Sequence, residues 1–257
     1  DKRLHRLMCY MESSKEQCLV AKVHDPPELL KLLLFVDADF ASEVDQSRST
    51  SGGILILAGP NTWFPLAWLS KKQTATSRST TEAEVASVAA SLFTEAILTL
   101  ELWNTVPGRE VELVILEDNQ ATIRVLRKGY SSKLRHISRT HKIDLGSISE
   151  VIECDDVNLT YCHTQFQAAD IFTKALKPDK WPNALDLLGM TYDKKDMAKD
   201  DETAAAAKAK AGKSSVGTSV PGQDESAAAA ASPKKTSQDV DCLLYTSDAA
   251  DDRACVD

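Results

Sequence analysis

The chain has no excess of basic residues, no paired cysteines and no long hydrophobic run. Its 30 Lys and Arg face 38 Asp and Glu, a formal net charge of −8, which argues against a uniformly basic nucleic-acid-binding protein. The six cysteines are scattered without a Cys-x-x-Cys pair, so we expect reduced thiols and no zinc site. No apolar run reaches the roughly 18 residues of a membrane span, and we expect no membrane partner.

Large apolar side chains are scarce in residues 191–257, which hold alanine tracts and many Lys, Asp and Ser. Such a segment buries too little surface to offset its chain entropy, so we expect a disordered tail. The stretch 243–252 resembles translated sequencing-adaptor readthrough, and we expect about the last fifteen residues to carry no function. Asp25-Pro26-Pro27 predicts a break, which divides the remainder into a short segment, 1–24, and a domain over 28–190.

Charge is unevenly distributed within the chain. Residues 1–190 carry 21 basic and 25 acidic side chains, yet seven basic and no acidic side chains fall within 119–143. The seven are Arg124, Arg127, Lys128, Lys133, Arg135, Arg139 and Lys142. A solvated helix face would explain them, but the one-sided charge favours contact with a polyanion.

Hydrophobic periodicity predicts an α/β fold. Ser79-x-x-Glu82 matches a capping box, which gives Glu82 a capping role, and Asn119 is placed to cap the following helix. The expected strands cover 18–23, 30–36, 54–58, 63–70, 111–116 and 157–162, with turns at 49–53 and 59–61. The expected helices cover 2–13, 79 to the Pro107-Gly108 stop, 120–128, part of 131–153, and 167–176, extended by 181–188. This order implies a five-stranded mixed sheet, with three antiparallel strands and two added through helical crossovers, flanked by helices.

Four carboxylates fall where strands end or helices begin. Asp37 and Asp118 follow apolar strands, Glu84 lies one turn into the long helix, and Asp170 is near the start of the last helix. Such a sheet can bring them to one edge, where oxygen ligands suit Mg²⁺ or Mn²⁺ rather than zinc. Taken singly, each is better explained as a solvated or capping residue. For Asp39 the two readings balance, and Glu117 is expected to point away from Asp118 with a structural role.

Six short segments resemble, in order and approximate spacing, the successive motifs of copia-type ribonuclease H domains. They are 35–41 (FVDADFA), 48–52 (RSTSG), 70–73 (SKKQ), 79–84 (STTEAE), 117–120 (EDNQ) and 169–174 (ADIFTK). The resemblance covers roughly 30–190. Upstream, residues 6–10 and 15–19 resemble the last helix of the reverse transcriptase domain that precedes this domain in retrotransposon polyproteins.

The resemblance implies a ribonuclease H-like fold and hydrolysis of the RNA strand of RNA–DNA hybrids during reverse transcription. It assigns catalysis and the binding of two Mg²⁺ ions, with Mn²⁺ as a substitute, to Asp37, Glu84, Asp118 and Asp170. The implied partners are the hybrid and the reverse transcriptase domain, in cytoplasmic retrotransposon particles. The alternative is an inactive remnant that binds hybrids or only stabilises the polyprotein.

Further residues are expected to contact the hybrid. Gln120 matches a position that reaches the minor groove, where 2′-hydroxyls mark RNA. Backbone contacts to the same strand are expected from the Ser49–Gly52 turn, which contains Ser51 and Gly52, and phosphate contacts from the basic stretch. The remaining candidates are Asn119, Arg124, Lys128, Arg139 and Lys142, with His163 as a candidate for product release.

Overall fold

The computed structural model describes residues 1–40, 47–105 and 111–191. Leu19–Met190 belong to one compact unit, and Asp1–Cys18 lie outside it. The first segment contains helix α1 (Lys2–Ser13), which buries none of its residues. Beyond residue 191, the expected tail lies outside the described residues, as does the Pro107-Gly108 helix stop. The domain limits expected from the sequence stay predictions.

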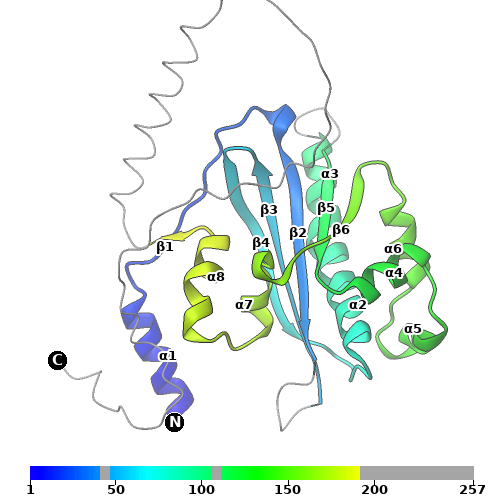
Figure 1. The fold of residues 1–257 in the computed structure, drawn as a ribbon, viewed down its shortest axis with the longest axis horizontal. Coiled ribbons are helices and arrows are strands. Elements are labelled where there is room, and N and C mark those ends of the chain that lie inside the picture. The colour runs from blue at the N-terminus through cyan, green and yellow to red at the C-terminus, as the bar shows by residue number, and fades with distance from the viewer. Residues whose placement is uncertain (41–46, 106–110, 192–257) are drawn as a thin grey trace, which may run out of the picture. The chain divides into compact units, whose positions relative to one another are not determined.

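A five-stranded mixed sheet forms the centre of the larger unit (Figure 1). Its strands are β2 (Lys31–Asp39), β3 (Thr50–Gly59), β4 (Thr62–Lys72), β5 (Leu113–Glu117) and β6 (Val157–Tyr161). The order across the sheet is β4-β3-β2-β5-β6. The pairs β2–β3 and β3–β4 are antiparallel, whereas β2–β5 and β5–β6 are parallel. The structure therefore confirms the predicted architecture of three antiparallel strands plus two added through helical crossovers.

Helices cover both faces of the sheet, which explains why β2 is almost continuously apolar. Leu32 and Leu34 point into the larger core, which includes residues of α2, α4 and α6. Phe35, the residue after Leu34, points the opposite way and joins the smaller core on the other face, where Phe172 and Leu187 pack. The helices are α2 (Thr80–Ser91), α3 (Ile97–Thr105), α4 (Gln120–Lys128), α5 (Ile137–Thr140), α6 (Leu145–Ile152), α7 (Asp170–Thr173) and α8 (Trp181–Leu187).

The long core helix begins where the capping box predicts. The Ser79 side chain accepts a hydrogen bond from the Glu82 backbone N–H at 3.2 Å. The helical stretch Thr80–Thr105 includes the π-helical turn η2 (Leu92–Ala96). Its length and hydropathy would also suit a membrane span, but half of its most apolar window is buried inside the fold, as a core helix requires.

Short elements complete the described chain. The strands β1 (Cys18–Leu19) and β7 (Met190–Thr191) form a separate two-stranded sheet. The 3₁₀ segments are η1 (Pro27–Leu29), η3 (Ser132–Leu134), η4 (Thr164–Phe166) and η5 (Pro178–Lys180).

Two predictions about local structure are wrong. The expected turn at 49–53 belongs largely to β3, where Gly52 pairs with Asp37 of β2. Its glycines serve close packing rather than a turn, because a Cβ at Gly52 would collide with Thr173 and one at Gly53 with Ser91. The expected helix over 167–176 is reduced to α7, since Gln167 before it and Lys174 after it are both extended, and α8 is a separate helix.

Candidate active site

Three of the predicted metal-binding carboxylates come together from three different elements. Asp37 lies near the C-terminal end of β2, and Asp118 directly follows β5, its parallel neighbour. The carboxyl ends of parallel strands meet at the same edge of a sheet, so the topology brings these two residues together. Glu84, one turn into α2, completes the group: one carboxylate oxygen from each residue lies within 4.8 Å of the others. We call these three residues the acidic group.

Helix α2 is fixed against this edge of the sheet by a buried serine. The Ser87 hydroxyl lies 2.6 Å from the Asp37 carbonyl oxygen and 3.1 Å from that of Gly52, and it donates to both. Glu84 precedes Ser87 by three residues and therefore lies on the same face of the helix. The hydrogen bonds of Ser87 thus hold α2 close to the strands, with Glu84 beside Asp37.

The environment of Glu84 disfavours its charged form. Burial raises the pKa of Glu84 to about 10, and the negative charges of Glu117, Asp37 and Asp118 add to the rise. Its Oε2 atom is buried and has no hydrogen-bond partner among the described residues. A buried carboxyl group with an unused oxygen is costly for the fold, and this is a common property of groups that meet a ligand.

Glu117 belongs to the same electrostatic environment, which the sequence did not reveal. Strand alternation turns it away from Asp118, as expected, and toward the face that α2 covers. Glu84 lies on that face, and the two carboxyl groups raise each other's energy. Burial, followed by the charge of Asp118, raises the pKa of Glu117 to about 8, although the Asn119 backbone N–H donates to Oε1 at 3.0 Å and opposes the rise.

Asp170, the fourth predicted carboxylate, lies outside the acidic group but is linked to it by Lys174. The Lys174 ammonium lies 2.8 Å from Asp170 Oδ1 and 2.8 Å from Asp37 Oδ1. The Thr173 hydroxyl donates to the other oxygen of Asp37. Burial raises the pKa of Asp170, and Lys174 opposes that rise. The ADIFTK segment contained this signal, since Asp170 and Lys174 are four residues apart, yet the contact with Asp37 depends on the fold.

The loop after β6 closes the other side of the acidic group. The Thr164 hydroxyl donates to Asp118 Oδ2 at 3.0 Å. His163 caps the 3₁₀ turn η4, since its Nδ1 accepts a hydrogen bond from the Gln165 backbone N–H at 3.3 Å, and its ring packs edge-on against Phe166. Its expected part in product release stays a prediction.

The acidic group fits a hard divalent cation. All of its donor atoms are carboxylate oxygens, the ligands that Mg²⁺ and Mn²⁺ prefer, and none is a thiolate or imidazole of the kind that zinc favours. The unused Glu84 Oε2 atom is a further oxygen available to an ion. Asp37, Glu84 and Asp118 would hold such an ion. Asp39 pairs with Thr50 at the end of the strand and is not among these residues.

A second cluster of charged and polar side chains surrounds Glu82, which lies in the first turn of α2, two residues before Glu84. Both histidine Nε2 atoms contact Glu82 Oε1, that of His136 at 3.0 Å and that of His141 at 3.3 Å. The Arg78 backbone N–H donates to Glu82 Oε2 at 2.8 Å. We call Glu82, His136 and His141 the Glu82 cluster. The capping role predicted for Glu82 is thus only part of its function, because its carboxylate also ties the segment around η3 and α5 to the start of α2.

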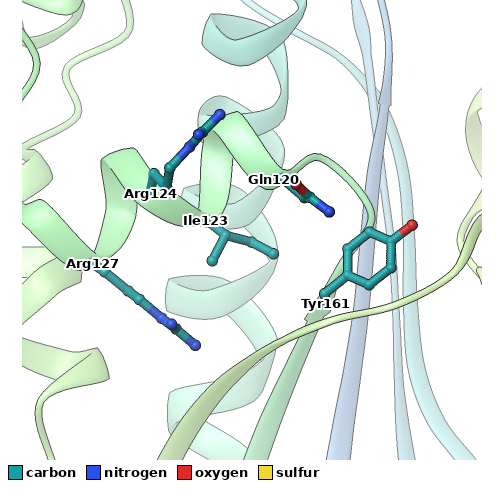
Figure 2. A pocket seen from close by; sticks show the side chains of 5 residues that line it. All are labelled: Gln120, Ile123, Arg124, Arg127 and Tyr161. Atoms are coloured by element: carbon teal, nitrogen blue, oxygen red, sulfur yellow. The ribbon is translucent and has the colours of Figure 1, made fainter.

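The predicted basic face lies along α4 and beyond it. Arg124, Lys128, Arg139 and Lys142 are exposed. A pocket of about 270 Å³ lies here. Figure 2 shows the side chains that line it, which are Gln120, Ile123, Arg124, Arg127 and Tyr161. The Arg127 guanidinium donates to the Leu159 carbonyl oxygen of β6 at 2.6 Å, so it also holds α4 on the edge strand. Gln120 and Arg124 thus lie in one open depression, next to an aromatic ring that the sequence did not single out.

Three other candidates for hybrid contact are engaged within the fold. Ser51 and Gly52 are buried. The Ser51 hydroxyl accepts from the Gln73 side chain at 3.0 Å, which removes the basis for contact through an exposed turn. The Asn119 side chain accepts from the backbone N–H groups of Ala121 and Thr122, so it caps α4 as predicted.

Comparison with known proteins finds similar sequences among retrotransposon polyproteins. It is 30% identical over 198 residues to the retrovirus-related Pol polyprotein from transposon RE1 of Arabidopsis thaliana, an alignment that covers 73% of this chain and 12% of that protein. It is 27% identical over 187 residues to the Pol polyprotein from transposon TNT 1-94 of Nicotiana tabacum, covering 72% of this chain and 13% of that protein. No family model matches the chain.

Among solved structures, the chain is similar to RNase H1 from the halophilic archaeon Halobacterium salinarum, with a TM-score of 0.40 and 15% identity. That likeness covers 61% of this chain and 98% of the archaeal one. The sequence matches carry the assignment: the chain is homologous to the retrovirus-related Pol polyproteins of copia-type plant transposons.

Proposed function

We propose that the domain hydrolyses the RNA strand of RNA–DNA hybrids by two-metal-ion catalysis during retrotransposon reverse transcription. One observation carries the proposal: the carboxylates of Asp37, Glu84 and Asp118, each from a different motif, lie within 4.8 Å of one another. Homology to Pol polyproteins supports the same reading. The reverse transcriptase domain of the same polyprotein is the proposed partner.

The carboxylates differ in what they contribute. Asp37 is buried at the centre, whereas Asp118 is partly exposed and therefore faces the side from which a substrate arrives. Glu84 is protonated near neutral pH, because burial raises its pKa to about 10, so cation binding requires it to release a proton. Bound divalent ions would supply charge neutralisation at the phosphate and activation of the attacking water.

The exposed basic side chains orient the substrate. Gln120 and Arg124 lie at the N-terminal half of α4, which directly follows Asp118 in the chain. A phosphate backbone held along α4 would therefore pass close to the acidic group. Contacts of this kind are insensitive to base sequence and weaken as salt rises.

The proposal is tested with the purified full chain on an end-labelled RNA–DNA hybrid in Mg²⁺, with RNA–RNA and DNA–DNA duplexes as controls. We expect cleavage of the RNA strand only, with 3′-hydroxyl and 5′-phosphate products. Asp118→Asn, which keeps the size of the side chain, should abolish cleavage and retain hybrid binding. Binding without cleavage by the unmodified chain would support the inactive remnant instead.

A further inference from the structure

The ammonium group of Lys174 forms an ion pair with the buried carboxylate of Asp37, which belongs to the acidic group. Its Nζ atom lies 2.8 Å from Asp37 Oδ1 and 2.8 Å from Asp170 Oδ1. The hydroxyl of the preceding residue, Thr173, donates to Asp37 Oδ2. The segment Asp170–Lys174 therefore uses both oxygens of Asp37, the same carboxylate that lies beside Glu84 and Asp118.

This contact competes with a divalent ion for the same carboxylate. Magnesium binds its oxygen ligands at about 2.0–2.1 Å and requires near-octahedral geometry. An ammonium that donates to Asp37 Oδ1 uses one of the lone pairs of that oxygen and neutralises part of the charge that would attract an ion. A divalent ion on the same carboxylate would lie close to the ammonium, and two cations near each other in a buried site repel each other. Asp37 therefore binds an ion less favourably while it holds Lys174.

The Lys174 side chain is partly exposed and has a second carboxylate partner, so it can leave Asp37 without losing every partner. Its side chain is 37% exposed, whereas that of Asp37 is only 1% exposed. Asp170, one helical turn earlier, is an independent partner that can keep the ammonium when Asp37 is released. Burial alone would lower the pKa of Lys174, but the carboxylates of Asp37 and Asp170 raise it, so the side chain is charged while it holds both.

We propose that Lys174 is an internal counter-cation, which neutralises Asp37 until a divalent ion replaces it and then remains paired with Asp170. Ion binding is then an exchange of one cation for another, and its affinity is set partly by Lys174. This inference rests on the proposed function, since it assumes that the acidic group binds a divalent ion. It makes Lys174 a positioning residue.

Isothermal titration of the full chain with Mg²⁺, at about pH 8 and low ionic strength, tests the exchange directly. Lys174→Met keeps the length of the side chain and removes its charge, so Mg²⁺ should bind roughly tenfold more tightly. Lys174→Arg should bind like the unmodified chain. Lys177→Met is the matched control, because Lys177 is exposed on the same segment, and it should leave the affinity unchanged.

A second measurement needs no substitution. Mass spectrometry after brief acetylation of the unmodified chain would report the reactivity of each lysine. Mg²⁺ should increase the labelling of Lys174, which loses one of its two carboxylate partners, and leave Lys177 unchanged.

Equal Mg²⁺ affinity for the unmodified chain and Lys174→Met would overturn the exchange and leave the proposed nuclease intact. Unchanged or slower labelling of Lys174 under saturating Mg²⁺ would do the same. If none of the proteins binds Mg²⁺ at millimolar concentration, the proposed function fails together with the inference.

Discussion

Two buried glutamates on the first turns of helix α2 have opposite surroundings. Glu82 Oε1 contacts both His136 and His141, and its Oε2 accepts the Arg78 backbone N–H. Glu84, two residues later, has an oxygen without a partner among the described residues and a pKa raised to about 10. Both carboxylate oxygens of Glu82 thus have partners, whereas one carboxylate oxygen of Glu84 has none among the described residues.

The comparison of Glu82 with Glu84 distinguishes a buried carboxylate that stabilises the fold from one that is available to a ligand. A buried carboxylate that is fully hydrogen-bonded holds neighbouring segments in place, and the loss of one partner is destabilising. A buried carboxylate among like charges works against the fold, and such sites persist where a ligand supplies the missing partner. We therefore expect matched substitutions in the two clusters to have opposite effects on stability and activity.

The largest expected effect comes from the acidic group. Glu84→Gln should reduce hybrid cleavage by about a thousandfold or more, since it removes a charge that catalysis needs. The melting temperature without divalent ions should be unchanged near neutral pH and higher at alkaline pH, because the amide stays neutral where the carboxyl group would ionise beside like charges. Cleavage assays and thermal unfolding in EDTA measure both. A large fall in melting temperature would mean that Glu84 is structural.

The Glu82 cluster should respond in the reverse way. Glu82→Gln should lower the free energy of unfolding by about 2 kcal/mol, since hydrogen bonds from both histidines and a backbone N–H lose their charged acceptor. Cleavage per folded molecule should fall less than tenfold, in contrast to Glu84→Gln. Urea unfolding and activity at a temperature where the variant is folded provide the two values. A complete loss of cleavage with unchanged stability would contradict this assignment.

The pH dependence of stability should also differ between the clusters. A carboxyl group with a raised pKa favours folding when protonated, so in EDTA the contribution of Glu84 is lost as the pH rises from about 4.5 toward about 10. We expect Glu84 to contribute a loss on the order of 4 kcal/mol between about pH 5 and about pH 8. Glu84→Gln should remove this part and leave the separate alkaline loss that comes from Glu117. Denaturant unfolding at several pH values measures it.

His141 should give the opposite trend. Burial lowers the pKa of His141, against the raising effect of Glu82. A histidine with a lowered pKa favours folding when neutral, so its contribution is lost as the pH falls below about 6.5.

For Glu84, the contradicting result is an unchanged loss of stability at alkaline pH in Glu84→Gln. Ionisation of Glu84 would then not be what destabilises the fold as the pH rises.

The smallest effect concerns the basic face. Arg124→Ala should weaken hybrid binding in Ca²⁺ a few-fold and reduce the salt dependence of log Kd by about one unit of slope if the guanidinium contacts one phosphate. Lys177→Ala serves as a control on another exposed surface. Fluorescence anisotropy at several salt concentrations gives both slopes. An unchanged slope for Arg124→Ala would remove α4 from the hybrid interface.

The sequence predicted what depends on local periodicity and motif order. The five strands, the helix from Ser79, the cap at Asn119 and the acidic residues at the C-terminal ends of β2 and β5 were all readable from neighbours along the chain. The Ser49–Gly53 segment was misread, because glycines suit both turns and closely packed strands, and only the contacts of Gly52 with Thr173 distinguish the two.

What the sequence alone determined is the set of elements and the identity of the carboxylates, since patterning and motif spacing are properties of the linear chain. Only the tertiary structure decided which of them share one environment. It placed Glu117 against Glu84, gave Glu82 its two histidines, and brought Lys174 between Asp170 and Asp37. Charge interactions act through space and depend on burial, so residues 137 positions apart, such as Asp37 and Lys174, become partners only once the sheet and its helices have packed.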